Sequence, residues 1–241
     1  MVELPRIRDF LKKNKNNLKK PRHIAVTMMG STIWARNNNI SKQEMYRKKH
    51  EILKKMIDMQ IKLDIPIMTF YLTRKKIEDT EHFIILIDSL IKLFEELRED
   101  SRIHKNQIKI SVFGKWYDLP RIVEPIKAII ESTSIYDKFF LNLCVNYEGQ
   151  EEIVDACKLI ARKIKLDKID VDAIDKELVK DNIYASYFLP PDLIIITGKR
   201  KKTNGLLLWD STDSLIYYSN KLWPDFNKDD FLNAIKEYQE N

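Results

Sequence analysis

The stretch His23-Ile-Ala-Val-Thr-Met28 is apolar almost throughout, and Gly30 follows it closely. A short run without polar alternation is typical of a strand that is buried on both faces of a parallel sheet. Four further runs of this kind are Ile67-Met-Thr-Phe-Tyr-Leu72, Ile108-Lys-Ile-Ser-Val-Phe113, Phe139-Phe-Leu-Asn-Leu-Cys-Val145 and Leu193-Ile-Ile-Ile-Thr197. The sequence therefore predicts a core of buried strands.

Segments with helical spacing of apolar residues lie between these runs. In one of them Phe83, Leu86, Leu90 and Phe94 fall on a single face. Helices are expected over residues 5–20, 41–63, 78–99, 119–132, 149–165, 171–180 and 229–239, with a capping box at Ser41 and Glu44 and with Pro120 in a first turn. Gly30-Ser-Thr32 is expected to open a loop, and residues 206–209 and 215–218 suit either a strand or a helix.

Strands that alternate with helices predict an α/β fold, with a mostly parallel sheet flanked by helices. The chain has 241 residues and shows no long linker, internal repeat or shift in composition. We therefore expect a single domain over residues 1–241, in which residues 1–20 form a basic N-terminal helix.

The composition excludes several classes of protein. Apolar residues make up 44% of the chain, which is enough to fold, and no run approaches the length of a membrane span. The N-terminus lacks the apolar segment of a secretory signal, and two cysteines, Cys144 and Cys157, make no disulfide framework. These features favour a cytoplasmic protein.

The net charge of +6 is concentrated in two clusters, within residues 12–22 and at residues 199–202. Basic clusters suit nucleic acid, an anionic membrane surface or a phosphorylated ligand, although many are simply solvated faces. The second cluster has no interleaved aromatic residues, so nucleic acid is not an expected partner. Peripheral membrane contact stays open as an alternative.

The common catalytic signatures are absent. The chain has no P-loop, no G-x-G-x-x-G, no zinc spacing around its four histidines and no G-x-S-x-G. What stands out is the polar or basic character of the segments that follow the strands, such as Thr73-Arg-Lys75 and Thr197-Gly-Lys199. Ligands bind at the edge of a parallel sheet where the strands end. In this chain the side chains at that edge suit an anion better than Mg²⁺.

Four stretches between Pro21 and Gln239 have the order and spacing of a known set of motifs. They are residues 21–36 (PRHIAVTMMGSTIWAR), 141–153 (LNLCVNYEGQEEI), 191–198 (PDLIIITG), and the pair 206–209 (LLLW) with 222–226 (LWPDF). On these residues the chain resembles the cis-prenyltransferase family, whose best known member is undecaprenyl diphosphate synthase. Trp34, Asn146, Tyr147 and Asn204 occupy motif positions.

The resemblance implies long-chain prenyl synthesis, in which isopentenyl diphosphate is added to an allylic diphosphate with Mg²⁺. The allylic diphosphate must ionise, so a metal, an acid that holds the metal, and arginines gather at its phosphates. The growing chain needs a tunnel between helices and sheet, which residues on 45–63 and 83–97 would line here.

The departures from the motifs fall where that chemistry lies. The family's metal-binding Asp corresponds to Met29 and its Glu to Leu215, and neither side chain can bind Mg²⁺. The candidates for diphosphate binding that remain are Gly30, Ser31, Lys42, Arg200 and Lys202. The family's C-terminal R-x-G has no counterpart up to Asn241, either because the sequence stops short of it or because a partner does not need it.

Three hypotheses follow. The first is a degenerate, non-catalytic subunit, resembling the Nogo-B receptor, that forms a heterodimer with a catalytic cis-prenyltransferase through its late helices and residues 206–226; a homodimer is the alternative. It predicts no catalytic residue, metal or cofactor in this chain, with Mg²⁺ supplied through the partner. The second is an active enzyme with an altered, Mg²⁺-dependent site. The third is a module that binds a prenyl diphosphate or a polyprenyl lipid.

Overall fold

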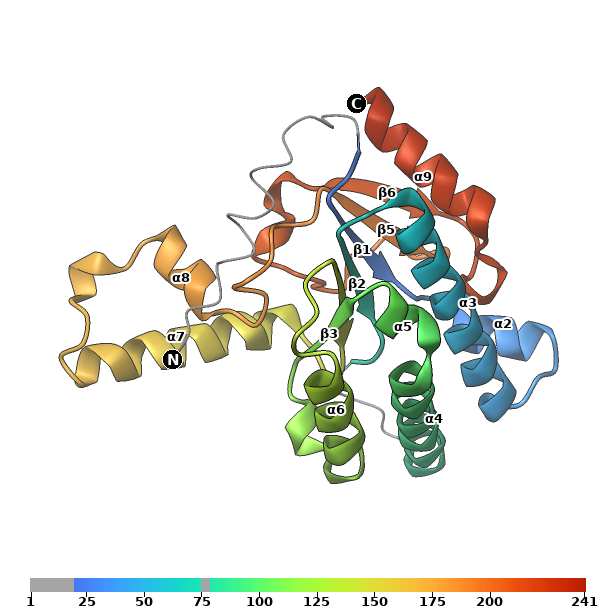
Figure 1. Ribbon diagram of the computed structural model, residues 1–241, viewed down its shortest axis with the longest axis horizontal. Helices are drawn as coiled ribbons and strands as arrows, with labels where there is room; N and C mark the ends of the chain where they lie inside the picture. The colour runs from blue at the N-terminus through green and yellow to red at the C-terminus, as the bar shows by residue number, and fades with distance from the viewer. Residues whose placement is uncertain (1–19, 75–78) are drawn as a thin grey trace.

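The computed structural model describes residues 20–74 and 79–241 and arranges them around one sheet (Figure 1). Six strands pair in parallel in the order β3-β4-β2-β1-β5-β6. They are β1 (His23–Thr27), β2 (Ile67–Tyr71), β3 (Ile108–Phe113), β4 (Phe139–Cys144), β5 (Leu193–Thr197) and β6 (Leu215–Ser219). The predicted fold class, a parallel sheet flanked by helices, is confirmed.

Helices cover both faces of the sheet. They are α2 (Ser31–Asn37), α3 (Lys42–Leu63), α4 (Thr80–Glu99), α5 (Ser101–Lys105), α6 (Pro120–Ser132), α7 (Gly149–Lys165), α8 (Lys176–Asn182) and α9 (Lys228–Glu240). Figure 1 shows α7 and α8 running out from one side of the molecule, away from α3, α4 and α9. None of the helices in the described ranges combines the length and the hydropathy that crossing a bilayer requires.

The strands lack polar alternation because the sheet is buried on both sides. Within β1, Ile24 and Val26 pack into the larger core cluster with α3, α4, α6 and α9. Ala25 points to the other face, where it packs with Tyr147, Phe188 and other residues of the α7–α8 side. Every residue of β1 is buried, which explains the continuous apolar run.

Three local predictions differ from the structure. The helix expected over residues 171–180 is instead a 3₁₀ turn at Val171–Ala173 followed by the separate helix α8, which begins at Lys176. Gly30-Ser-Thr32, expected to open a loop, leads directly into the helix α2 at Ser31–Asn37, because Gly30 supplies the left-handed conformation from which the helix starts. Of the two ambiguous segments, 215–219 is the edge strand β6, while 206–209 is a turn. The helix expected at 5–20 lies outside the described residues. Ser41 caps α3 as expected, since its Oγ accepts from the Glu44 N–H.

One glycine of the second motif is required by close packing. Gly149 begins α7, and a Cβ built there would lie 2.1 Å from the carbonyl oxygen of Gly205. We expect Gly149→Ala to lower the free energy of unfolding by about 1–3 kcal/mol, because two backbone segments would have to separate. Urea denaturation would measure this, with Gln150→Ala on the exposed face of α7 as the control. Equal stability of the two variants would contradict the prediction.

Candidate functional site at the carboxyl edge of the sheet

The turn that leaves β1 is fixed by main-chain contacts. The Met29 N–H donates to Thr197 Oγ1 at 2.9 Å, and the Met29 carbonyl accepts from the Trp223 N–H at 2.9 Å. Gly30 has φ of 91°, and a Cβ there would lie 2.5 Å from Leu222 Cδ2. Residues of β5 and of the segment 222–223 therefore set the shape of this turn.

The LWPDF motif ties the turn to the helices beside it. Trp223 is fully buried and stacks on Phe226, and its indole N–H donates to the carbonyl of Lys49 in α3 at 2.9 Å. The Trp34 indole N–H of α2 donates to Asp225 Oδ1 at 2.8 Å. These motif positions therefore maintain the fold of the edge, whatever the edge binds.

The residues at the two metal positions do not fit Mg²⁺. Met29 offers a half-buried thioether, which is a soft ligand, whereas Mg²⁺ prefers oxygen. Leu215 packs against the core and offers no ligand atom. In residues 20–74 and 79–241, no group of three or more His, Cys, Asp and Glu side chains could hold a metal ion. The donor set at this edge therefore does not match the metal that the resemblance implies.

A polar cluster occupies the space beside Met29. The Asn204 Nδ2 group lies 3.5 Å from Met29 Sδ and donates to the carbonyl of Lys202 at 3.1 Å. The Asn204 Oδ1 atom accepts from Arg74 Nη2 at 2.8 Å. Arg74 follows β2 and Asn204 follows β5, so the fold joins two strand ends that are 130 positions apart in sequence. The motif predicts Asn204 at this edge, whereas Arg74 is not among the binding candidates that the motifs indicate.

The candidate residues are not all gathered together. Arg200 and Lys202 are exposed in the segment after β5, near Asn204. Lys42 begins α3 and pairs with Asp79 (2.8 Å) and Glu81 (3.6 Å), and its hydrogen bond to Asp79 raises the pKa of Lys42. Ser31 is buried in the first turn of α2. The main-chain carbonyl of Lys202 thus contacts the Asn204 side chain, Arg200 lies on the same exposed segment, and Lys42 has acidic partners of its own.

The Asn146 and Tyr147 positions are structural in this chain. Asn146 Nδ2 donates to the carbonyl of Lys115 at 2.7 Å, joining the ends of β3 and β4. The Tyr147 hydroxyl donates to Glu152 at 2.6 Å and accepts from the Leu207 N–H at 3.1 Å. Burial raises the pKa of Glu152 to about 7, although its hydrogen bond from Tyr147 favours the ionised form. This network connects α7 to the turn at 206–209.

Two buried basic groups of α3 escaped sequence analysis. Lys49 is 8% exposed, and its ammonium donates to the carbonyl of Leu72 at 2.7 Å. Burial lowers the pKa of Lys49 to about 8 and that of neighbouring His50 to about 3. A run of charged residues around position 49 gave no signal that two of them turn inward.

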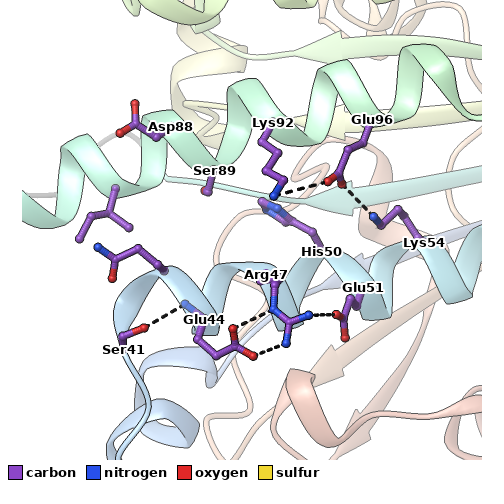
Figure 2. A pocket seen from close by; sticks show the side chains of 12 residues that line it. Ser41, Glu44, Arg47, His50, Glu51, Lys54, Asp88, Ser89, Lys92 and Glu96 are labelled. Carbon is purple, nitrogen blue, oxygen red and sulfur yellow. Dashed lines mark hydrogen bonds and ion pairs between the residues drawn. The ribbon is translucent and has the colours of Figure 1, made fainter.

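His50 lies at a polar groove between α3 and α4 (Figure 2). The groove has a volume of about 590 Å³. The Arg47–Glu51 ion pair lies along α3, and the Lys54–Glu96 ion pair joins α3 to α4. Its lining residues are Ser41, Gln43, Glu44, Arg47, His50, Glu51, Lys54, Ile85, Asp88, Ser89, Lys92 and Glu96. The two helices expected to line a tunnel thus divide their residues between the apolar core and this polar groove.

Known proteins resemble this chain over most of its length. A tritrans,polycis-undecaprenyl-diphosphate synthase (geranylgeranyl-diphosphate specific) from Thermoplasma acidophilum is 36% identical over 226 residues, covering 91% of this chain and 86% of that protein. An isoprenyl transferase from Prochlorococcus marinus is 36% identical over 228 residues, covering 91% and 81%. The crystal structure of lavandulyl diphosphate synthase from Lavandula x intermedia, in complex with dimethylallyl diphosphate, has a TM-score of 0.86 over 92% of this chain and 97% of that one, at 22% identity. At this level of sequence identity, the last comparison shows that the two proteins share a fold.

These likenesses define an α/β protein with the fold of a prenyl diphosphate synthase. The family described as putative undecaprenyl diphosphate synthase matches residues 27–241, and the chain belongs to this family, the cis-prenyltransferases. The predicted resemblance is therefore confirmed at the level of the family. The names of the two relatives are those of enzymes, so the degenerate, Nogo-B-receptor-like assignment stays a prediction.

Proposed function

We propose that this chain is a non-catalytic member of the cis-prenyltransferase family that supports a catalytically complete subunit in polyprenyl carrier synthesis. The observation that carries the proposal is the state of the β1 turn. Its scaffold is intact, because Thr197, Trp223 and Leu222 fix the backbone around Met29. Its chemical group is not retained, because the thioether of Met29 stands where the family's motif has a metal-binding carboxylate.

The second metal position supports the same proposal. Leu215 begins β6 and packs against the core. Its side chain is a hydrocarbon, so it has no atom that could bind a metal ion. A chain that keeps the packing residues of its motifs and lacks both acids retains a family surface without the group that activates the allylic diphosphate. We expect pairing through the late elements, where Leu208 and Tyr218 are exposed, with a homodimer as the alternative.

An active enzyme is the second candidate, since the relatives that are 36% identical are named as a synthase and a transferase. Such an enzyme would have to stabilise the leaving diphosphate with cations of its own, such as Arg200 and Lys202. A lysine is a point charge without the fork of an arginine, so this grip would be less directional.

The experiment is a prenyl-transfer assay with labelled isopentenyl diphosphate, geranylgeranyl diphosphate as primer, and Mg²⁺. The chain alone is expected to give no butanol-extractable product above a blank without protein. Mixed with a family member that carries Asp and Glu at the positions of Met29 and Leu215, it is expected to form a complex and raise that member's rate.

Product from the chain alone, lost in Lys202→Ala, would refute the proposal and establish the active enzyme. Absence of any complex at micromolar concentration, by analytical ultracentrifugation, would also contradict it. Lys168→Ala, an exposed lysine after α7, is the matched control for the first outcome.

A further inference from the structure

The polar groove between α3 and α4 lies apart from the strand ends. Its lining residues come from these two helices and from Ser41, which precedes α3. None of the described residues that line it belongs to a strand or to the segment after β5. Its volume of about 590 Å³ falls within the range of roughly 300–1,000 Å³ that is usual for small-molecule sites. The groove is therefore a separate candidate for a binding site.

His50 faces this groove without a hydrogen bond. The residue is only 6% exposed, and its ring makes no hydrogen bond to any other residue that the structure describes. Figure 2 shows the ring reaching from α3 toward Lys92 of α4. The buried His23, by contrast, has partners at both ring nitrogens, at 2.6 Å to the Leu189 carbonyl and at 2.8 Å to Thr69 Oγ1. Since buried polar groups are nearly always satisfied in native proteins, the two nitrogens of His50 are available to a ligand in the groove.

The charged side chains that line the groove already neutralise one another. The pairs are Arg47 with Glu44 and Glu51, Lys54 and Lys92 with Glu96, and Asp88 with Arg121. An ionic ligand would therefore meet no charge among these lining residues that still lacks a partner. Its desolvation would go uncompensated, so the groove favours an uncharged ligand.

The polar groups that remain include both donors and acceptors. Burial lowers the pKa of His50 to about 3, so the neutral imidazole offers one N–H donor and one acceptor nitrogen. The amide of Gln43 makes no hydrogen bond to another described residue and also offers both kinds of group. The Ser89 hydroxyl donates to the Leu86 carbonyl at 2.7 Å, so its oxygen can still accept. Hydroxyl groups match such a surface because each one donates and accepts, and Ile85 offers an apolar contact for C–H groups.

We propose that this groove binds an uncharged, hydroxyl-rich small molecule of the sugar or polyol class. His50 is the central contact, since its N–H donates to one hydroxyl group and its other nitrogen accepts from a second. Gln43 is a further contact. The inference goes beyond the proposed function and does not depend on it, because the lining residues take no part in the β1 turn or in pairing through the late elements.

Isotopic labelling of the histidine nitrogens in the full chain gives a direct NMR readout, because the chain has four histidines. The probes are glucose, myo-inositol and trehalose. At least one is expected to shift the His50 signals saturably, with a dissociation constant on the order of 1 mM, while His23 and His104 stay unchanged. The spectrum of His50→Gln assigns the signals. No shift with any of the three probes, or equal shifts of all four histidines, would overturn the proposal.

Charged analogues of one probe test the choice of ligand class. Glucosamine carries a positive charge and glucuronate a negative charge, on the same ring as glucose. Both are expected to bind more weakly than the best of the three neutral probes, because the groove holds no unpaired charge to receive them. Tighter binding of either analogue would overturn the assignment of an uncharged ligand.

Two variants separate binding from folding. His50→Leu is expected to weaken binding tenfold or more, and to melt at the temperature of the wild type or above it, because no hydrogen bond within the protein is lost. Unchanged binding with a lower melting temperature would show that His50 is structural and would overturn the proposal. The exposed Gln43→Ala is expected to weaken binding about three- to tenfold without a change in melting temperature.

The matched control is Gln150→Ala on the exposed face of α7, which runs out from the other side of the molecule (Figure 1). It is expected to bind like the wild type, and equal binding by Gln43→Ala and Gln150→Ala would contradict the proposed contact. The proposed function fails on a different result, namely product formed by the chain alone.

Discussion

Asp210→Ala is expected to destabilise the protein by about 3–5 kcal/mol, the range for breaking a buried ion pair by removing one partner. Asp210 contacts the Lys180 ammonium, and the two side chains are only 2% and 5% exposed. Lys180 also donates to the carbonyl of Ala185 at 3.0 Å. The variant would leave a desolvated ammonium without this carboxylate, and this link between α8 and the 3₁₀ helix at Asp210–Asp213 would be lost.

Urea denaturation with linear extrapolation would measure the change. The double variant Lys180→Met, Asp210→Leu is expected to recover most of the loss, because it removes both charges from the apolar site. The control is Glu124→Ala, which breaks the exposed pair with Lys127 and should cost less than about 1 kcal/mol. A cost for Asp210→Ala as small as that of the control would show that the pair is hydrated.

Stability is expected to fall as the pH drops from 6.5 to 4, because two histidines are buried in neutral form. Burial lowers the pKa of His23 to about 4 and that of His50 to about 3. His23 is enclosed between the Leu189 carbonyl and Thr69 Oγ1. The unfolded chain therefore takes up these protons at higher pH than the folded chain. As the pH falls through this range, each histidine lowers the free energy of unfolding by about 1 kcal/mol per pH unit.

Glu152 acts in the opposite direction. Its pKa is raised from 4.5 to about 7, so the folded chain binds this proton first, and stability rises as the pH falls from 7 to 4.5. Between pH 6.5 and 4.5 the effects of Glu152 and of one histidine cancel. The free energy of unfolding of the wild type should therefore fall by about 1 kcal/mol per pH unit, the slope expected for a single titrating group. Glu152→Gln should steepen that slope and His50→Gln should flatten it.

The groups that face His50 bear on this experiment. From its own helix they are Arg47, Lys49, Glu51 and Lys54, and from α4 they are Asp88, Lys92 and Glu96. Lys49 and Lys54 reinforce the low pKa of His50. Chemical denaturation at several pH values would give the slopes, and identical slopes for wild type and His50→Gln would contradict a buried neutral imidazole.

The strands could be predicted because burial on both faces leaves continuous apolar runs that are visible in a single sequence. The strand at residues 215–219 could not be predicted. It is β6, at the edge of the sheet, and its mixture of exposed and buried residues gives a sequence pattern that also suits an amphipathic helix. The short helix α2 was missed because Gly30 and Ser31 read locally as a turn.

The site was predictable only where a motif named the residue. Met29 and Asn204 were found in that way, but their contact with each other and with Arg74 depends on which strands are neighbours, and the spacing along the chain does not give the strand order. The inward orientation of Lys49 was hidden for a related reason, since side-chain direction at a helix face follows from what packs there.

The position of β1 at the centre of the sheet has a consequence for synthesis on the ribosome. Of the strands in residues 20–74 and 79–241, β1 emerges first, yet one of its two neighbours is β5, and Ala25 pairs with Ile194. Until that late segment leaves the exit tunnel, β1 has an open edge of unpaired amides that can recruit foreign strands. Contacts between such distant segments also slow folding. We therefore expect nascent chains arrested before residue 193 to depend on chaperones far more than the released protein does.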